Sequence, residues 1–143
     1  MARSRIQFGD KLLERALRNF KDDILDQVRE IIQNTGLILF NQAVSLAPVA
    51  EVDGGNLKNS ISFDSSTDGL SCTVHVGASY AIYVEYGTGI YAVEGNGRKT
   101  PWVYWSDKLN RWVWTRGMEA QPFWNPSIDI ARRYFLKEMS RLG

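Results

Sequence analysis

In the first third of the chain, the apolar residues are spaced so that they would lie on one face of a helix. From about Asp10 to Leu46 the apolar positions recur at steps of three and four, which is typical of an amphipathic α-helix. The face consists of Leu13, Leu17, Phe20, Ile24, Val28, Ile31 and Thr35. Gly36 costs roughly 1 kcal/mol relative to Ala inside a helix, so we expect a kink or a break near Asn34–Gly36. Pro48 ends the helical region, because the residue before a proline is pushed out of the α conformation.

The middle of the chain predicts short elements joined by turns. Asp53–Asn56 has loop composition, and Leu57–Phe63 is compatible with a strand or a short turn. Leu70–Gly77 alternates with period two and predicts a strand with one buried face. That face consists of Leu70, Cys72, Val74 and Val76. Tyr80–Tyr86 is too short for periodicity to separate a strand from a helix, and a glycine turn follows it.

The last third predicts a hairpin and a helix. Trp102–Trp105 and Arg111–Trp114 are β-favouring runs separated by a short polar loop. Pro126 suits the first turn of a final helix, whose apolar stripe is Ile128, Ala131, Phe135 and Met139. The order of elements favours an α+β fold with a long N-terminal helix, a mainly antiparallel sheet and a C-terminal helix. We expect a single domain over residues 1–143, in which residues 90–117 form a loop and hairpin elaboration.

Composition and charge narrow the function classes. The chain has 17 basic and 16 acidic side chains, so it lacks the basic excess typical of nucleic-acid-binding proteins. A single cysteine, Cys72, is compatible with folding in a reducing cytoplasm. The N-terminal arginines are followed by no apolar segment of a signal peptide, and no run approaches the ~20 apolar residues of a membrane span. We therefore expect a soluble protein made inside a cell.

Candidate catalytic chemistry is sparse. His75 and Cys72 are three residues apart on a predicted strand, so their side chains lie on opposite faces and form no joint site. Glu85 stands out as a carboxylate among apolar residues, and it must be either exposed or satisfied by a partner. Lys99-Thr100 resembles the end of a phosphate-binding loop, but Arg98 stands where that motif needs glycine. We expect no enzyme activity, no cofactor and no metal site.

The Trp-rich hairpin permits three interpretations. Its aromatic side chains lie near Arg98, Lys99, Arg111 and Arg116, and exposed aromatics beside cations can stack on nucleic-acid bases or another ligand. They can also pair across the hairpin and pack on the core. Thirdly, they can contact another protein, since Trp, Tyr and Arg are enriched at interface hot spots. The sequence favours the second and third interpretations, because nothing supplies a long basic track.

Three stretches taken in order resemble a known family. The first is Ala47-Pro48 after the long helix, followed by Gly55–Ile61. The second is Tyr80–Gly89, with the sequence YAIYVEYGTG, and the third is Ala120–Pro126, with the sequence AQPFWNP. Over about residues 12–141 they resemble the HK97 gp10-like family of phage proteins, variously called tail-component, minor capsid or tail-completion proteins. Small departures from the family pattern are Gly54 before Gly55, and Trp124 after the Pro-Phe pair.

The resemblance implies a structural protein at the neck of a long-tailed phage or prophage. Such proteins look like tail-completion or head–tail joining proteins, which form a ring, expected to be a hexamer, on the upper end of the tail. The implied partners are further copies of the chain, the tail tube protein and the head-completion or connector protein, with nucleic acid only passing through the ring. The implied location is the virion, after synthesis in the host bacterial cytoplasm. The alternative is a module that binds single-stranded nucleic acid or another ligand through the aromatic hairpin.

The turn, loop and hairpin that follow the YVEY stretch are the segments we assign to subunit or connector contacts. The expected contact residues are Tyr86, Arg98, Lys99, Trp105, Trp112, Trp114 and Trp124.

Overall fold

The computed structural model describes residues 11–49 and 55–142. Its elements in chain order are α1 (Lys11–Leu46), α2 (Asn56–Asn59), β1 (Ile61–Ser65), β2 (Cys72–Val76), α3 (Ala81–Tyr86), the 3-10 turn η1 (Gly89–Tyr91), β3 (Trp102–Ser106), β4 (Arg111–Thr115) and α4 (Trp124–Ser140). The predicted α+β class, the long first helix, the Trp-rich hairpin and the last helix are confirmed. Residues 53–54 of the loop expected at Asp53–Asn56 lie outside the described residues.

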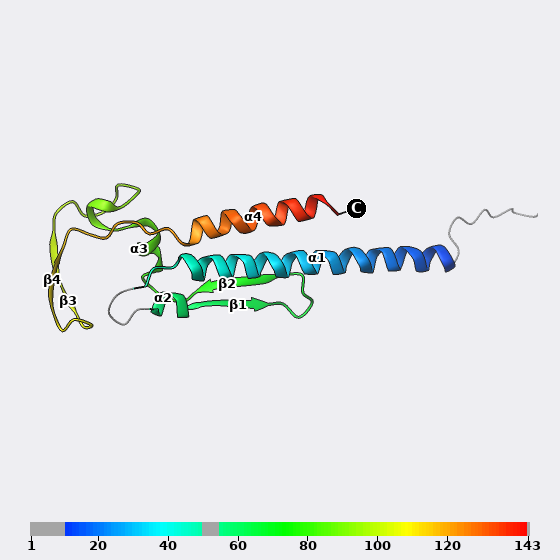
Figure 1. Ribbon diagram of the computed structural model, residues 1–143, viewed down its shortest axis with the longest axis horizontal. Helices are drawn as coiled ribbons and strands as arrows, with labels where there is room; N and C mark the ends of the chain where they lie inside the picture. The colour runs from blue at the N-terminus through cyan, green and yellow to red at the C-terminus, as the bar shows by residue number, and fades with distance from the viewer. Residues whose placement is uncertain (1–10, 50–54, 143) are drawn as a thin grey trace, which may run out of the picture.

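The chain is built along α1 (Figure 1). α4 packs antiparallel on one side of α1, and the β1–β2 hairpin lies along another side. α3 and the β3–β4 hairpin gather beyond the C-terminal end of α1, whereas its N-terminal part projects past the end of α4. The strands form two separate antiparallel pairs rather than one sheet, because α3 and its glycine-rich loop separate the two hairpins.

α1 is one continuous helix through Gly36, so the expected kink or break there is wrong. Gly36 is buried against the β1–β2 hairpin. A Cβ at this position would lie 2.5 Å from both Cys72 Sγ and Phe63 Cε2. The glycine therefore lets a sheet approach the helix backbone closely, and this packing offsets the unfavourable helix propensity. Cys72 Sγ also donates to the Ile32 carbonyl oxygen at 3.4 Å.

The sequence did not decide the secondary structure of two segments, and each of them contains helix in the structure. The Leu57–Phe63 region contains the end of the single-turn α2, followed by the first residues of β1. The Tyr80–Tyr86 region contains α3, in which the adjacent residues Val84 and Glu85 are both buried. Adjacent side chains on a strand point to opposite faces, so a helix is the conformation that directs both inward. The strand expected at Leu70–Gly77 is confirmed as the shorter β2, with Cys72, Val74 and Val76 on the half-buried face. Leu70 precedes β2 and is 37% exposed, so its expected place on that face is wrong.

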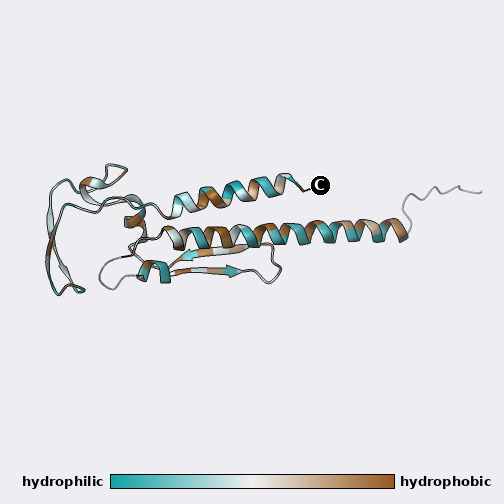
Figure 2. Cartoon of the chain, viewed as in Figure 1, coloured by the Kyte–Doolittle hydropathy of each residue, from teal (hydrophilic) through white to brown (hydrophobic). Residues whose placement is uncertain are grey.

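The core lies at one end of the molecule, where α1 ends and α4 begins. Phe123 is only 1% exposed there, and it packs in a cluster with five other buried residues. They are Ala43, Ala47, Leu57, Ile61 and Val84. Many other apolar side chains of the described residues stay at the surface, both on the first turns of α1 and on the β3–β4 hairpin (Figure 2).

Replacing Gly36 by alanine should destabilise the chain, although alanine is the better helix former. The added methyl group must displace Cys72 or Phe63, and such overpacking costs about 1–3 kcal/mol. Urea unfolding of Gly36→Ala, compared with Asn41→Ala at an exposed position of α1, measures the difference. An unfolding free energy at or above that of the unchanged protein would contradict this account of the α1–sheet contact.

Candidate functional site: an assembly surface

Glu85 fastens α3 to the beginning of α4. Its side chain is 5% exposed, and its carboxylate accepts three backbone hydrogen bonds. Oε2 accepts from the N–H groups of Phe123 at 2.8 Å and Trp124 at 2.9 Å, and Oε1 accepts from Asn125 at 3.0 Å. These donors are the N–H groups that have no partner within a helix. A negative charge is also favourable at the positive end of the helix dipole.

A second set of bonds joins the glycine turn to the segment that precedes α4. Thr88 N–H donates to the Met118 carbonyl at 2.8 Å, and Met118 N–H donates to Thr88 Oγ1 at 2.8 Å. Gln121 N–H donates to the Val84 carbonyl at 2.8 Å. Gly87 has a φ of 77°, and a Cβ there would lie within 2.9 Å of both Ala120 N and Met118 O. The turn therefore needs glycine both for its backbone conformation and for the close approach of the returning chain.

These contacts anchor a hairpin whose one face is uncovered. In the β3–β4 register Trp105 lies opposite Trp112, and Val103 lies opposite Trp114. Paired residues of an antiparallel ladder share a face, so these four side chains form one surface, which we call the aromatic face. Their exposed fractions are 59% for Val103, 46% for Trp105, 67% for Trp112 and 59% for Trp114. Trp105 and Trp112 meet edge to face, with ring centroids 5.7 Å apart.

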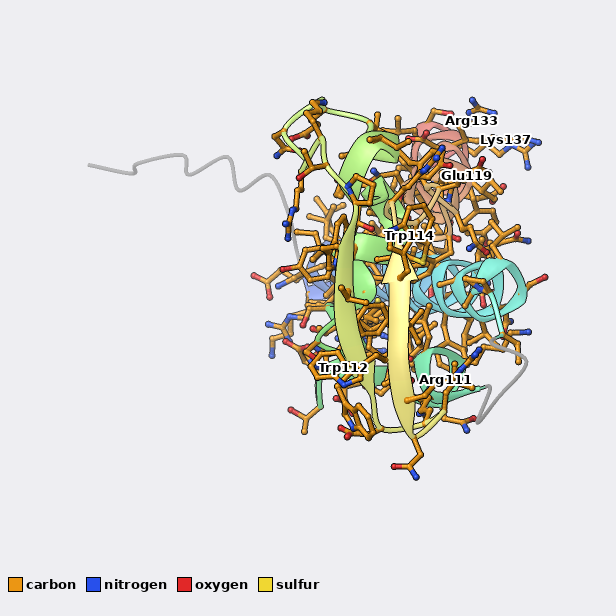
Figure 3. All side chains as sticks on the ribbon, turned by 90° about the vertical axis from the view of Figure 1, so that its left-hand side faces the viewer. Arg111, Trp112, Trp114, Glu119, Arg133 and Lys137 are labelled. Atoms are coloured by element: carbon orange, nitrogen blue, oxygen red, sulfur yellow. The ribbon has the colours of Figure 1, made fainter. Side chains whose placement is uncertain are left out.

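Cations border the hairpin. The Arg116 guanidinium lies 5.3 Å from the ring centroid of Trp114, and that of Arg98 lies 5.5 Å from Trp102. Both geometries permit cation–π attraction. Arg98 Nε also donates to Thr100 Oγ1 at 3.3 Å, and Lys99 is exposed. Figure 3 views this end of the molecule, with Arg111 at the start of β4 and Trp112 and Trp114 along it.

The residues expected to make assembly contacts fall into two groups. Arg98, Lys99, Trp105, Trp112 and Trp114 lie on the hairpin or on the loop that leads into it.

Tyr86 and Trp124 belong instead to the α3–α4 junction. The hydroxyl of Tyr86 accepts a hydrogen bond from Asn125 Nδ2 at 3.2 Å, and Trp124 packs half-buried against the core. These two side chains line one hollow of about 390 Å³, together with His75 and Glu85.

That hollow gives no sign of catalytic chemistry. Both carboxylate oxygens of Glu85 are occupied by backbone donors, which agrees with the structural role that the sequence favoured. His75 is exposed, whereas Cys72 lies against α1, so the expected separation of the two is confirmed. Burial raises the pKa of the Cys72 thiol, which makes it a weaker nucleophile near neutral pH. Within residues 11–49 and 55–142, no cluster of three or more His, Cys, Asp or Glu side chains is placed to hold a metal ion.

Two structural roles were missed from the sequence. The sequence marked Glu85 as needing a partner, but it gave no sign that the partner is the start of α4, 38 residues away. Val103 was not recognised as part of the aromatic face. The predicted strand ends at Trp105, whereas β3 includes Ser106, and this extra residue sets the register that pairs Val103 with Trp114.

Comparison with known proteins assigns the family. A model of the HK97-gp10-like family, described as "Bacteriophage HK97-gp10, putative tail-component", matches residues 11–87. The match covers more than half of the chain, which therefore belongs to this family of phage tail components. No curated protein and no solved structure matches the chain. The matched residues run from the start of α1 through Glu85 to Gly87, while the hairpin and α4 follow them.

Family membership supports a virion structural protein and points away from an enzyme. Among the described residues, no helix is both long enough and apolar enough to cross a membrane.

Replacing Glu85 by alanine should cost about 2–4 kcal/mol of unfolding free energy, because buried N–H groups lose their acceptor. Glu85→Gln keeps one acceptor oxygen without the charge, so it should cost less. Chemical unfolding monitored by tryptophan fluorescence measures both variants. The exposed Glu94→Gln serves as the matched control and should change little. Equal stability of Glu85→Ala and the control would refute the capping role.

Proposed function

We propose that this tail component completes the upper end of a long phage tail and joins it to the head. In this proposal several copies form a ring at the neck, with a hexamer expected, between the tail tube protein and the head-completion or connector protein. The genome passes through the ring without being recognised by sequence. The protein is made in the cytoplasm of the host bacterium and then becomes part of the virion.

The observation that carries the proposal is the exposed aromatic face of a chain that belongs to a tail-component family. Each aromatic side chain buries roughly 150–250 Å² when it is covered, so the exposed tryptophans offer a large gain on assembly. Trp and Arg are also the residues most enriched at interface hot spots. Contiguous apolar surface with a charged rim indicates a protein contact.

The anchoring of the hairpin also suits a ring subunit. The hydrogen bonds of Glu85 and Thr88 hold the chain in place on both sides of residues 90–117. The hairpin therefore projects from a fixed base. A ring needs one surface of each subunit to meet a different surface of the next. The aromatic face supplies the first of these surfaces, in contact with the neighbouring subunit or the connector.

A deletion of the gene in its phage, followed by electron microscopy of the lysate, tests the role. We expect filled heads beside unattached tails, some of irregular length. Intact virions with normal tails would remove the joining role.

A complementing variant tests the surface itself. Trp112→Thr keeps a β-favouring residue in β4 but removes the most exposed side chain of the aromatic face, so assembly should fall while the protein stays folded. Tyr104→Thr, on the opposite face of the same hairpin, is the matched control. Plaque yield and the circular dichroism of the purified variants are the two measurements. Loss of folding in Trp112→Thr, or equal loss of yield in both variants, would count against the aromatic face.

A second function has one observation in its favour. The arginines stacked on Trp102 and Trp114 resemble the aromatic and cationic pairs of single-strand binding surfaces. That alternative predicts binding to single-stranded DNA that weakens steeply with salt and is reduced by Trp112→Thr. The absence of such binding at low salt would eliminate it.

A further inference from the structure

The N-terminal part of α1 extends beyond everything that packs on the rest of the helix (Figure 1). The last turn of α4 reaches the level of Gln27 and Glu30, where these residues share a hollow with Glu138 and Leu142. The turn between β1 and β2 reaches Arg29, whose Nε donates to the Asp68 carbonyl at 2.8 Å. Residues 11–25 therefore project by roughly 22 Å, at 1.5 Å per residue.

The projecting helix keeps an apolar stripe. Leu17 is 59% exposed and Phe20 is 62% exposed, and Ile24 continues their line at the spacing of a helix–helix seam. One heptad further along, Ile31 is buried beside α4. The stripe is thus a continuation of the face that α4 covers, and an antiparallel helix is the element that already packs on this face.

Charge is segregated along the same helix. Residues 11–21 carry four basic side chains and one acidic side chain, for a net charge of +3. Residues 22–30 carry four acidic side chains and one basic side chain, for a net charge of −3. In a second copy laid antiparallel with Leu17 opposite Phe20, three acidic side chains within residues 22–26 lie opposite residues 11–15, which carry Lys11 and Arg15. A parallel copy in register opposes like charges along the whole helix.

We propose that the free protein associates through this stripe with a second copy of itself, the two α1 helices packing antiparallel about a two-fold axis. Leu17 of each copy then lies opposite Phe20 of the other. Glu14 and Lys21 flank the stripe on one side, so Glu14 of each copy meets Lys21 of the other. The two bodies lie at opposite ends of the pair, because each projecting segment runs past the other before either body begins.

The pairing is distinct from the ring contact. A two-fold contact joins the same patch on both copies and closes on itself, so it does not propagate into a ring. In the free protein, before assembly, this two-fold pairing covers the apolar stripe of α1. About four helical turns make a small interface compared with the roughly 1,200–2,000 Å² of stable dimers, so the association should depend on concentration.

Sedimentation equilibrium of the purified chain, under reducing conditions that exclude a Cys72 disulfide, tests the proposal. We expect a monomer–dimer equilibrium at sub-millimolar concentrations. Phe20→Ser, Glu14→Lys and Lys21→Glu should each raise the dissociation constant at least about tenfold. The double variant Glu14→Lys with Lys21→Glu restores the opposite charges across the seam and should recover most of the affinity. Arg133→Glu, at an exposed position of α4, is the control for the charge change and should leave the equilibrium unaltered.

Recovery in the double variant supports the antiparallel pair, because Glu14 and Lys21 face one another only in that orientation. A monomer at every concentration overturns the proposal. So does a dimer that is insensitive to Phe20→Ser, or one that the double charge reversal fails to restore. The experiment uses the free protein in solution, so its outcome is independent of whether the protein acts at the phage neck.

Discussion

The carboxylate of Glu85 is the contact on which the arrangement of the last third of the chain depends. It accepts the N–H groups of Phe123, Trp124 and Asn125, and so it fixes where α4 begins. With that start fixed, Phe123 enters the core and α4 runs back along α1. Because α3 precedes residues 90–117 and α4 follows them, the same contact also holds the two ends of this loop and hairpin close together. One buried charge thereby links the core to the surface proposed for assembly.

Apolar side chains are distributed unevenly over the molecule. Its buried core is gathered at one end, while the aromatic face and the stripe on the projecting part of α1 remain at the surface. A free-standing monomer gains nothing from such surfaces, which are unfavourable in water. A subunit of an assembly gains from both, because each becomes covered when neighbours bind.

The sequence predicted those elements whose periodicity is strong, namely both long helices, β2 and the Trp-rich hairpin. The prediction of a kink or break at Gly36 was wrong, because helix propensity describes only the local sequence. The glycine is needed for contact with the β1–β2 hairpin, whose Cys72 lies 36 residues further along the chain. The partner of Glu85 was beyond prediction for the same reason. The three stretches on which the resemblance rested contain both ends of this contact, Glu85 in the second and Phe123–Asn125 in the third, and the family model matches the first of them and the second as far as Gly87. A resemblance thus identified the right segments, while only the structure gave the bond between them.

We propose that the protein sits at the junction of head and tail. Gold labelling of a tag fused after Gly143, viewed on intact virions, tests it most directly. The account predicts label confined to the neck, between the capsid vertex and the uppermost part of the tail tube. Label spread along the tube, or gathered at the tail tip, would contradict it, although either result would still be compatible with the tail-component family.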